Sequence, residues 1–559
     1  MSDPDSTTCR SEKIWSSVLL AATVVDCGFQ IAWFWRFRAH NITMDGIAYI
    51  GLARHLLDGN FKASLHGYWS PLTSWIIAAG ALFTGEYTLV ARLVTIASFL
   101  LCLPLLYVLT LRLWNSRAAA ALAVFWFSTA RGVLAMAVGS ILADFILTAC
   151  VLLYFILLVH ALRRNRPAAW VLLGAAHALA FLAKAIAMPW LTISTLLAIV
   201  LQSPRTPRRL VASLLLAFLL PAAVWTAWGF TLRTKYGVFT TGDQLRANLM
   251  INWTRSLSHH PRGDYVTYGD TSALYDDYMV GETSWANIQG FRLGNTGLLK
   301  MILKSESQNV PQAAKEMLIL LNPGGALALT GMIVLLIGKW SLNRTQAAFT
   351  VIVLISALSL IAAYCMLVFD GRYVIPLLPL LIAICCPLPL PASLAIDSPQ
   401  LAPWFQKITL SLFIASMIFF AVYWASPFRT VDRDFEASCY DAANALRTEK
   451  PKGTVVSIGD GPYPVHGVGF EVGPYVAYMA GWRVIGGNAQ LPDLSQATLL
   501  AEQALSAKSD AIAVWGSPAS PVYQRIVERI QQDAGSSSAR KITDPHKGEV
   551  GTVILRDPR

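Results

Sequence analysis

Charged residues are scarce in this sequence. Only 14% of its 559 residues are Asp, Glu, Lys or Arg, whereas 55% are hydrophobic, and the mean hydropathy is +0.50. Soluble globular domains carry about 25% charged residues. The composition therefore excludes an ordinary soluble domain and predicts a polytopic α-helical membrane protein.

The sequence also lacks the short patterns that usually bind metals or nucleotides. Its eight cysteines include no CxxC pair, which excludes the common structural zinc motifs, and they suggest no disulfide framework. The turn Gly459-Asp460-Gly461 does not match the G-x-G-x-x-G pattern of dinucleotide-binding folds. Neither a zinc module nor a nucleotide-binding domain is indicated.

The excess of positive charge, +11 at pH 7, lies in short clusters between apolar runs. This distribution argues against nucleic acid as a partner, because nucleic-acid-binding proteins gather basic residues on one surface. Cytoplasmic loops of membrane proteins are enriched in Lys and Arg, so we expect these clusters and the N-terminal Arg10 and Lys13 to face the cytoplasm. The clusters are Arg112 and Arg117; Arg163, Arg164 and Arg166; Arg205, Arg208 and Arg209; Lys339 and Arg344.

Apolar runs long enough to cross a bilayer number about eleven. An odd number of spans puts the two termini on opposite sides of the membrane. With the basic N-terminus in the cytoplasm, the C-terminus is expected on the outer, periplasmic side of the inner membrane. The short run Pro71–Thr84 is not counted, because a crossing there would put the Arg112 and Arg163 loops on the wrong side; we expect it to be re-entrant or interfacial. The spans are predicted near 15–35, 90–111, 118–137, 142–162, 167–184, 186–202, 210–231, 317–338, 346–369, 373–390 and 407–426.

Two domains are expected. Residues 1–427 would form the membrane domain, with a first outer loop at 37–89 and a large outer loop at 232–315 that is long enough to act as a lid. Residues 428–559 would form a small extracytoplasmic α/β domain, because strand-like runs alternate there with helical patterns. Strands are predicted at 454–458, 482–485, 511–515 and 551–555, and helices at 287–302 in the large loop and at 435–449, 473–480, 494–507 and 521–534.

The polar segment 43–71 follows the first span and carries an acid, Asp45, at its entrance. A carboxylate so close to lipid is costly unless it is solvated or used. Asp45 is therefore a candidate catalytic base. The alternative, that the segment is only a tethering loop, stays open.

A series of short motifs accompanies this acid along the chain. Tyr49 follows Asp45, and Tyr68-x-Ser70-Pro71-Leu72, Gly85 and Ala91-Arg92-Leu93 come next; then Arg131, Leu142-Ala143-Asp144, Gly174, Lys184, and Arg372-Tyr373-x-x-Pro376-x-x-Pro379. In this order and placement the motifs resemble those of GT-C integral-membrane glycosyltransferases, in the branch of aminoarabinose transferases, protein O-mannosyltransferases and lipopolysaccharide-core glycosyltransferases. Many relatives carry a second acid directly after the first, where this chain has Gly46.

The resemblance implies transfer of a sugar from a polyprenyl-phosphate donor to a cell-envelope glycan, glycolipid or protein on the outer face of the membrane, with net inversion. Asp45 would be the general base, acting alone or with Asp144 as a second catalytic carboxylate. Lys184, Arg131 and Arg372 would bind the phosphate. Further candidates for substrate binding are Tyr373, Tyr49 and Tyr68.

Several of these assignments have alternatives. Asp144 either holds a divalent cation, Mg or Mn, that bridges to the phosphate, or pairs with Arg131 or Lys184. Lys184 and Arg372 either bind phosphate or reach from span ends toward lipid headgroups. In the large outer loop His259, His260, Asp264 and Asp270 form a polar cluster, but their spacing does not support a metal site.

Two functions from other classes compete with glycosyl transfer. A lipid or glycan transporter would show inverted repeats and Gly- or Pro-broken spans in matching halves, and the sequence has no such symmetry. A non-catalytic scaffold for envelope assembly would leave Asp45 dispensable.

Overall fold

The computed structural model divides the chain into two compact units, which we describe separately. The first comprises Met1–Arg36, Leu65–Leu249 and Arg292–Ala425, and the second Phe37–Ser64, Met250–Phe291 and Ser426–Arg559. The structure describes residues 4–35, 43–130, 132–164, 166–202, 206–242, 266–267, 295–337, 342–366, 369–387, 443–444, 446–448, 453–459, 472–488, 494, 497–506, 509–516, 518–534, 539–544 and 548–556. Arg131, the cluster His259, His260, Asp264 and Asp270, and the predicted span 407–426 lie outside these residues.

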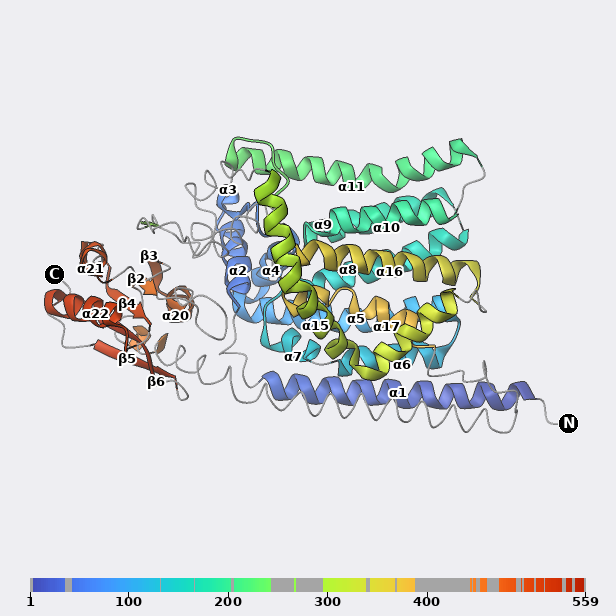
Figure 1. Ribbon diagram of the computed structural model, residues 1–559, viewed down its shortest axis with the longest axis horizontal. Coiled ribbons are helices and arrows are strands. Elements are labelled where there is room, and N and C mark those ends of the chain that lie inside the picture. The colour runs from blue at the N-terminus through green and yellow to red at the C-terminus, as the bar shows by residue number, and fades with distance from the viewer. Residues whose placement is uncertain are drawn as a thin grey trace. The chain divides into compact units, whose positions relative to one another are not determined.

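The first unit is helical throughout the part that the structure describes (Figure 1). Its helices are α1 (Pro4–Phe34), α4 (Pro71–Thr84), α5 (Tyr87–Trp114), α6 (Arg117–Thr129), α7 (Val133–Gly139), α8 (Asp144–Arg164), α9 (Pro167–Ala183), α10 (Ala187–Gln202), α11 (Pro207–Tyr236), α15 (Asn295–Ile337), α16 (Arg344–Cys365) and α17 (Leu378–Cys385). The 3-10 turn η2 (Gly371–Val374) precedes α17.

Five of the described helices are long and apolar enough to cross a membrane: α1 from Glu12, α5, α8, α11 and α16. A sixth candidate is the pair α6 and α7, which is bent by 57°. The helices α4, α9 and α10 are apolar but shorter. The chain is therefore a multi-pass membrane protein, and the number of eleven spans stays a prediction.

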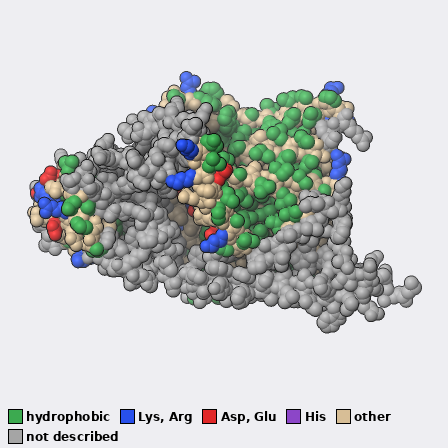
Figure 2. All heavy atoms as spheres, in the orientation of Figure 1, with side chains coloured by type: hydrophobic (Ala, Val, Ile, Leu, Met, Phe, Trp, Pro, Cys, Tyr) green, Lys and Arg blue, Asp and Glu red, His purple; other side chains and the backbone are tan. Residues whose placement is uncertain are grey.

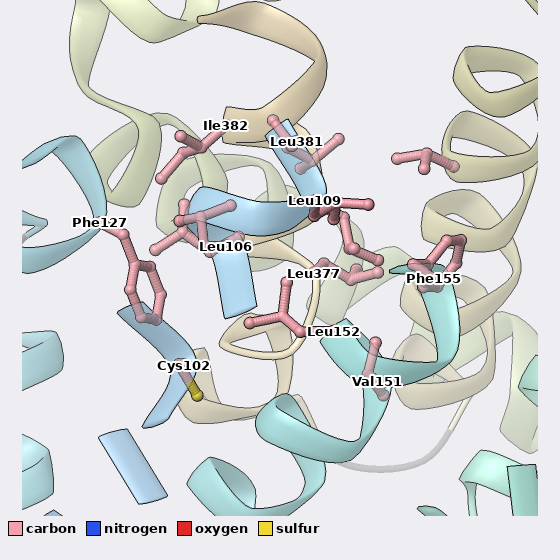
Figure 3. Close-up of a cluster of buried hydrophobic side chains, with 14 of the residues drawn as sticks. Cys102, Leu106, Leu109, Phe127, Val151, Leu152, Phe155, Leu377, Leu381 and Ile382 are labelled. Carbon is pink, nitrogen blue, oxygen red and sulfur yellow. The ribbon is translucent and has the colours of Figure 1, made fainter. Parts of the chain in front are cut away.

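The interior of this unit is a continuous apolar core between helices that lie far apart in sequence. Phe127 of α6 stacks on Phe99 of α5 at 5.7 Å, and Phe155 of α8 meets the ring of Phe349 in α16 edge-on at 5.8 Å. Figure 3 draws a part of this core. All of these side chains are buried, so close packing between helices holds the unit together. The labelled members are Cys102, Leu106, Leu109, Phe127, Val151, Leu152, Phe155, Leu377, Leu381 and Ile382.

Hydrophobic side chains also cover much of the described part of the face of this unit that Figure 2 shows. Phe83 is 89% exposed, Leu219 71% and Leu358 68%. Such a surface would be unfavourable in water, but it is the expected surface of helices that face lipid.

The helix α15 differs from the layout expected from the sequence. A helix at 287–302 and a separate span at 317–338 were expected, whereas one helix of 43 residues runs from Asn295 to Ile337. Pro311 lacks an N–H and removes one bond from the helix ladder. Buried residues beyond it, Ala313 and Leu320, pack against the core and keep the helix continuous.

The second unit contains α2 (Met44–Leu57), α3 (Phe61–Ser64) and a mixed six-stranded sheet in the order β1-β3-β2-β4-β6-β5. The strand β2 pairs in parallel with both β3 and β4, while β4 with β6, β6 with β5, and β1 with β3 are antiparallel. Buried Ile512 and Val514 of β4 pack with Ile526 and Ile530 of α22. The elements are β1 (Val266–Thr267), β2 (Thr454–Gly459), α20 (Val472–Ala480), β3 (Arg483–Asn488), α21 (Ala497–Ser506), β4 (Ala511–Trp515), α22 (Pro521–Ala534), β5 (Ala539–Asp544) and β6 (Gly548–Leu555).

Candidate functional site

An ion pair joins two residues that the sequence singled out. Asp144 is the first residue of α8, and Lys184 follows α9 in an extended conformation, with φ −160° and ψ 128°. The Lys184 Nζ atom lies 2.8 Å from Asp144 Oδ1, and the two side chains are only 12% and 4% exposed. Because a buried charge is costly alone, each partner makes the burial of the other tolerable.

A tyrosine ring places a second cation beside this pair. Lys184 Nζ lies 4.8 Å from the centre of the Tyr373 ring, and the guanidinium carbon of Arg372 lies 5.3 Å from the same centre. The other aromatic neighbour is Tyr364 of α16, whose ring stacks on Tyr373 at 4.3 Å with an interplanar angle of 12°. Cations are attracted to the face of an aromatic ring, so Tyr373 helps to keep Lys184 and Arg372 close together.

The local fold of η2 fixes the position of Arg372. Asp370 precedes the turn, and its Oδ1 atom accepts a hydrogen bond of 3.0 Å from the backbone N–H of Arg372. The other carboxylate oxygen, Oδ2, lies 3.2 Å from Arg372 Nε. The acid thus holds both the backbone and the side chain of Arg372.

Gly371 lets α15 approach this turn. A Cβ atom added at Gly371 would lie 3.1 Å from Glu316 Oε2, closer than side chains normally allow. The turn is therefore flanked by two acids, Asp370 and Glu316, and by the ion pair of Lys184. Two cations that share one ring are suited to an anionic group with several oxygens, because each cation can donate to a different oxygen.

Tyr68 belongs to another aromatic cluster in the first unit. Its backbone N–H donates to His66 Nδ1 at 2.8 Å, and its ring meets Trp69 edge-on at 5.0 Å. The hydroxyl of Tyr236 accepts a hydrogen bond from Gly67 N at 3.1 Å, and this contact ties the loop to the end of α11.

Asp45 and Tyr49 lie on α2 in the second unit. The Thr43 hydroxyl caps this helix by accepting a hydrogen bond of 3.2 Å from Gly46 N. Asp45 is in the first turn and half-buried, and Tyr49 is buried. A carboxylate in the first turn of a helix interacts favourably with the helix dipole.

Tyr364 and Asp370 were not predicted as site residues from the sequence. Asp370-Gly371 is a turn signal, and an acid two residues before Arg372 is a signal that could have identified Asp370. Nothing comparable points to Tyr364, because its stacking depends on how the chain turns back after α16.

Asp144 does not fit the divalent cation considered from the sequence. The Lys184 ammonium already lies against its Oδ1 atom, and a second cation there would be repelled. Within the described residues no group of three or more His, Cys, Asp or Glu is arranged to hold a metal ion. We therefore derive no step from a metal.

Comparison with known proteins places this arrangement in a wider context. Residues 68–228 match the family described as dolichyl-phosphate-mannose-protein mannosyltransferase. ArnT from Cupriavidus metallidurans, solved with bound undecaprenyl phosphate, matches with a TM-score of 0.50 and 13% identity over 98% of this chain and 99% of that one.

A second solved structure is similar to the same extent. The archaeal oligosaccharyltransferase AglB from Archaeoglobus fulgidus, in complex with an inhibitory peptide and a dolichol-phosphate, has a TM-score of 0.51 and 14% identity over 98% of this chain and 76% of that one. No curated protein sequence matches the chain. The matches confirm the resemblance noted from the sequence: the chain has the fold of the GT-C membrane glycosyltransferases.

Proposed function

We propose that this protein is a membrane glycosyltransferase that moves a sugar from a polyprenyl-phosphate donor to a cell-envelope glycan, glycolipid or protein. The reaction would take place on the outer face of the inner membrane. The observation that carries the proposal is the cluster in which Lys184 and Arg372 share the Tyr373 ring. Its setting in a GT-C-like fold adds support, since ArnT and AglB of similar fold were solved with undecaprenyl phosphate and dolichol-phosphate.

The two cations suit a lipid phosphate that acts as leaving group. In a single displacement the acceptor oxygen forms a bond to the anomeric carbon, and the bond from that carbon to the phosphate oxygen breaks. The phosphate leaves with the electron pair, so negative charge grows on its oxygens in the transition state. Lys184 and Arg372 would stabilise that charge, and attack from the opposite face gives net inversion.

Asp45 is assigned as the base that accepts the proton of the acceptor hydroxyl. A charged carboxylate in the first turn of α2 suits this role. Asp144 would keep Lys184 charged and in place through their 2.8 Å contact. No protonation of the leaving phosphate is needed, and so one base is sufficient.

The test compares envelope glycans and glycolipids by mass spectrometry in cells with the wild-type chain, a deletion, or Asp45→Asn at matched expression. We expect both the deletion and Asp45→Asn to lose one sugar residue from a defined product. The matched control is Asp58→Asn, which removes an exposed carboxylate at the other end of α2 and should leave the product intact. Full product with Asp45→Asn would contradict the base assignment, and an unchanged envelope after deletion would contradict glycosyl transfer.

A further inference from the structure

The division of the chain into units gives α2 an unexpected neighbour. The segment Phe37–Ser64, which contains α2 and α3, groups with the C-terminal residues Ser426–Arg559 and with Met250–Phe291. The strand β1 from Met250–Phe291 adds to the edge of the sheet at β3. The C-terminal unit is therefore built from three separate parts of the chain, one of which bears Asp45.

A specific contact joins α2 to the sheet region. The helices α2 and α20 touch, and the guanidinium carbon of Arg54 lies 5.6 Å from the centre of the Tyr478 ring. This distance is within the range of a cation–π interaction. Arg54 lies in the last turn of α2, and Tyr478 lies near the end of α20.

The end of α20 is firmly attached to the sheet. Trp482 N donates to Ala477 O at 2.9 Å, and Gly481 N donates to Tyr478 O at 3.1 Å. Gly481 has a φ of +73°, which only glycine adopts readily at a helix end. Trp482 is buried, and β3 starts at the next residue and pairs with Thr454 of β2. Tyr478 therefore has a well-fixed position relative to the sheet.

The geometry of α2 connects Arg54 to Asp45. Nine residues separate them, which is roughly 14 Å along a helix axis, and nine steps of about 100° place them on opposite faces. A helix of 14 residues moves as a rigid rod. Holding Arg54 against α20 on one face would thus fix the position of the carboxylate on the other face.

We propose that the contact between Tyr478 and Arg54 sets the position of α2, so that the C-terminal α/β region serves as the mount for the acid-bearing helix. Tyr478 and Arg54 are then positioning residues, which act through Asp45. The effect on catalysis rests on the proposed function, whereas the positioning of α2 by the contact between Tyr478 and Arg54 does not.

The test of the mount is hydrogen exchange on the purified full-length protein in detergent. Tyr478→Leu removes the ring, and we expect amide exchange in α2 to rise roughly two- to fivefold, as the loss of an exposed cation–π contact would give. Tyr478→Phe keeps the ring and should match wild type. The matched control is Arg529→Gln, which removes an ion pair of 3.6 Å between α22 and α21 in the same unit and should leave α2 unchanged.

Two results would overturn the mount. One is unchanged α2 exchange in Tyr478→Leu, and the other is an equal rise in α2, the sheet and the helices of the first unit, which would show general destabilisation. Arg54→Lys supplies a second check, because it keeps a cation and should exchange less than Arg54→Gln.

The envelope glycan assay then separates the mount from the proposed function. If both hold, Tyr478→Leu lowers the product while Tyr478→Phe keeps it. If deletion of the protein leaves the envelope unchanged but α2 exchange still depends on Tyr478, the proposed function fails and the mount stands. If Asp45→Asn abolishes the product and Tyr478→Leu changes neither exchange nor product, the mount fails and the proposed function stands.

Discussion

At the scale of single residues, the ion pair between Lys184 and Asp144 is expected to matter both for the stability of the fold and for the reaction. Both side chains are almost fully buried, so removing one partner leaves an uncompensated charge. We expect Lys184→Met to lower the free energy of unfolding by about 3 kcal/mol. The double variant Asp144→Asn with Lys184→Met should recover most of that loss, because neither charge remains. It should still fail to make product, because the cation for the phosphate is absent.

Thermal unfolding in detergent and the envelope glycan assay check the two parts of this prediction separately. Arg166→Met is the matched control, since it removes an exposed cation at the other end of α9. Product made by the double variant would show that Lys184 only balances Asp144. A single variant as stable as wild type would mean that the pair is better solvated than its exposure indicates.

The residues of this cluster were found from the sequence because they stand in the series of motifs that resembles GT-C glycosyltransferases, and because charged residues are unusual at span ends. Lys184, Asp144 and Arg372 are charged residues beside long apolar runs, and such residues are rare unless they are paired or used. Their partners were harder to predict. Pairing of Asp144 with Lys184 was one of two open alternatives, and Tyr364 depends on a chain reversal that leaves no local pattern.

At the scale of elements, the break between α6 and α7 shows that a continuous hydrophobic run in the sequence does not predict where a helix is interrupted. One span at 118–137 was expected, whereas the structure has two helices that meet at Gly132, whose φ is +68°. Buried Arg92 donates from Nη1 to Val138 O and Gly139 O, both at 3.2 Å. A cation at a helix C-terminus satisfies its free carbonyls, and so Arg92 fixes the end of α7 just before the turn that leads to Asp144.

Where strands are concerned, local patterns were more informative. The run predicted as a strand at 511–515 coincides with β4, because a fully buried strand needs a short, continuous apolar run. The strand β5 was missed, since Ala539–Asp544 is largely polar. It forms through its antiparallel pairing with β6, a contact that sequence alone does not display.

The packing of α9 against α11 gives a prediction at this scale. A Cβ atom at Gly174 would lie 2.6 Å from Ala217 O, which is a backbone atom and cannot move aside alone. We therefore expect Gly174→Ala to destabilise the protein by about 1–3 kcal/mol. Gly51→Ala is the control: this glycine also lies inside a helix, but nothing lies within 4 Å of an added Cβ, so its greater helix propensity should stabilise the protein slightly.

Thermal unfolding of both glycine variants in detergent decides the matter. The two substitutions add the same methyl group to a helix, so a difference between them reports the close approach of α9 and α11. Equal stabilities of the Gly174→Ala and Gly51→Ala variants would contradict the close packing of α9 against α11.

At the scale of the whole membrane unit, the basic segments gather at one end of the helices. Glu12 Oε1 accepts hydrogen bonds from Ser116 Oγ and Arg117 N at 2.8 and 2.7 Å. Gln346 Nε2 donates to Leu113 O at 3.1 Å, and Arg344 Nη2 lies 3.4 Å from Leu201 O. Among the described residues, the predicted cytoplasmic cluster of Arg112 and Arg117 therefore adjoins the start of α16 at Arg344, which in turn lies beside the end of α10.

The candidate site lies at the opposite end. The helix α8 runs from Asp144 to Arg164, a rise of about 30 Å, which equals the thickness of the hydrocarbon layer. The shorter helix α9 runs from Pro167 to Ala183, with Arg166 before it and Lys184 after it, and α10 folds back beside it, since His177 Nε2 lies 3.1 Å from Met188 O. The length of α8 thus separates Asp144 from the basic residues at the far end of the helix by about the thickness of the hydrocarbon layer.

This arrangement predicts on which side the site opens. Because basic loops stay in the cytoplasm, Asp370, whose side chain is 50% exposed, should face the outside. In intact cells an impermeant maleimide should label Asp370→Cys, and should label Arg209→Cys, at an exposed position that begins α11, only after the membrane is permeabilised. The wild-type chain sets the background, and its cysteines at 27, 102, 150, 365, 385 and 386 are buried. Labelling of Arg209→Cys before permeabilisation would reverse the orientation and place the two cations on the cytoplasmic face, where transfer to an outer-face acceptor could not occur.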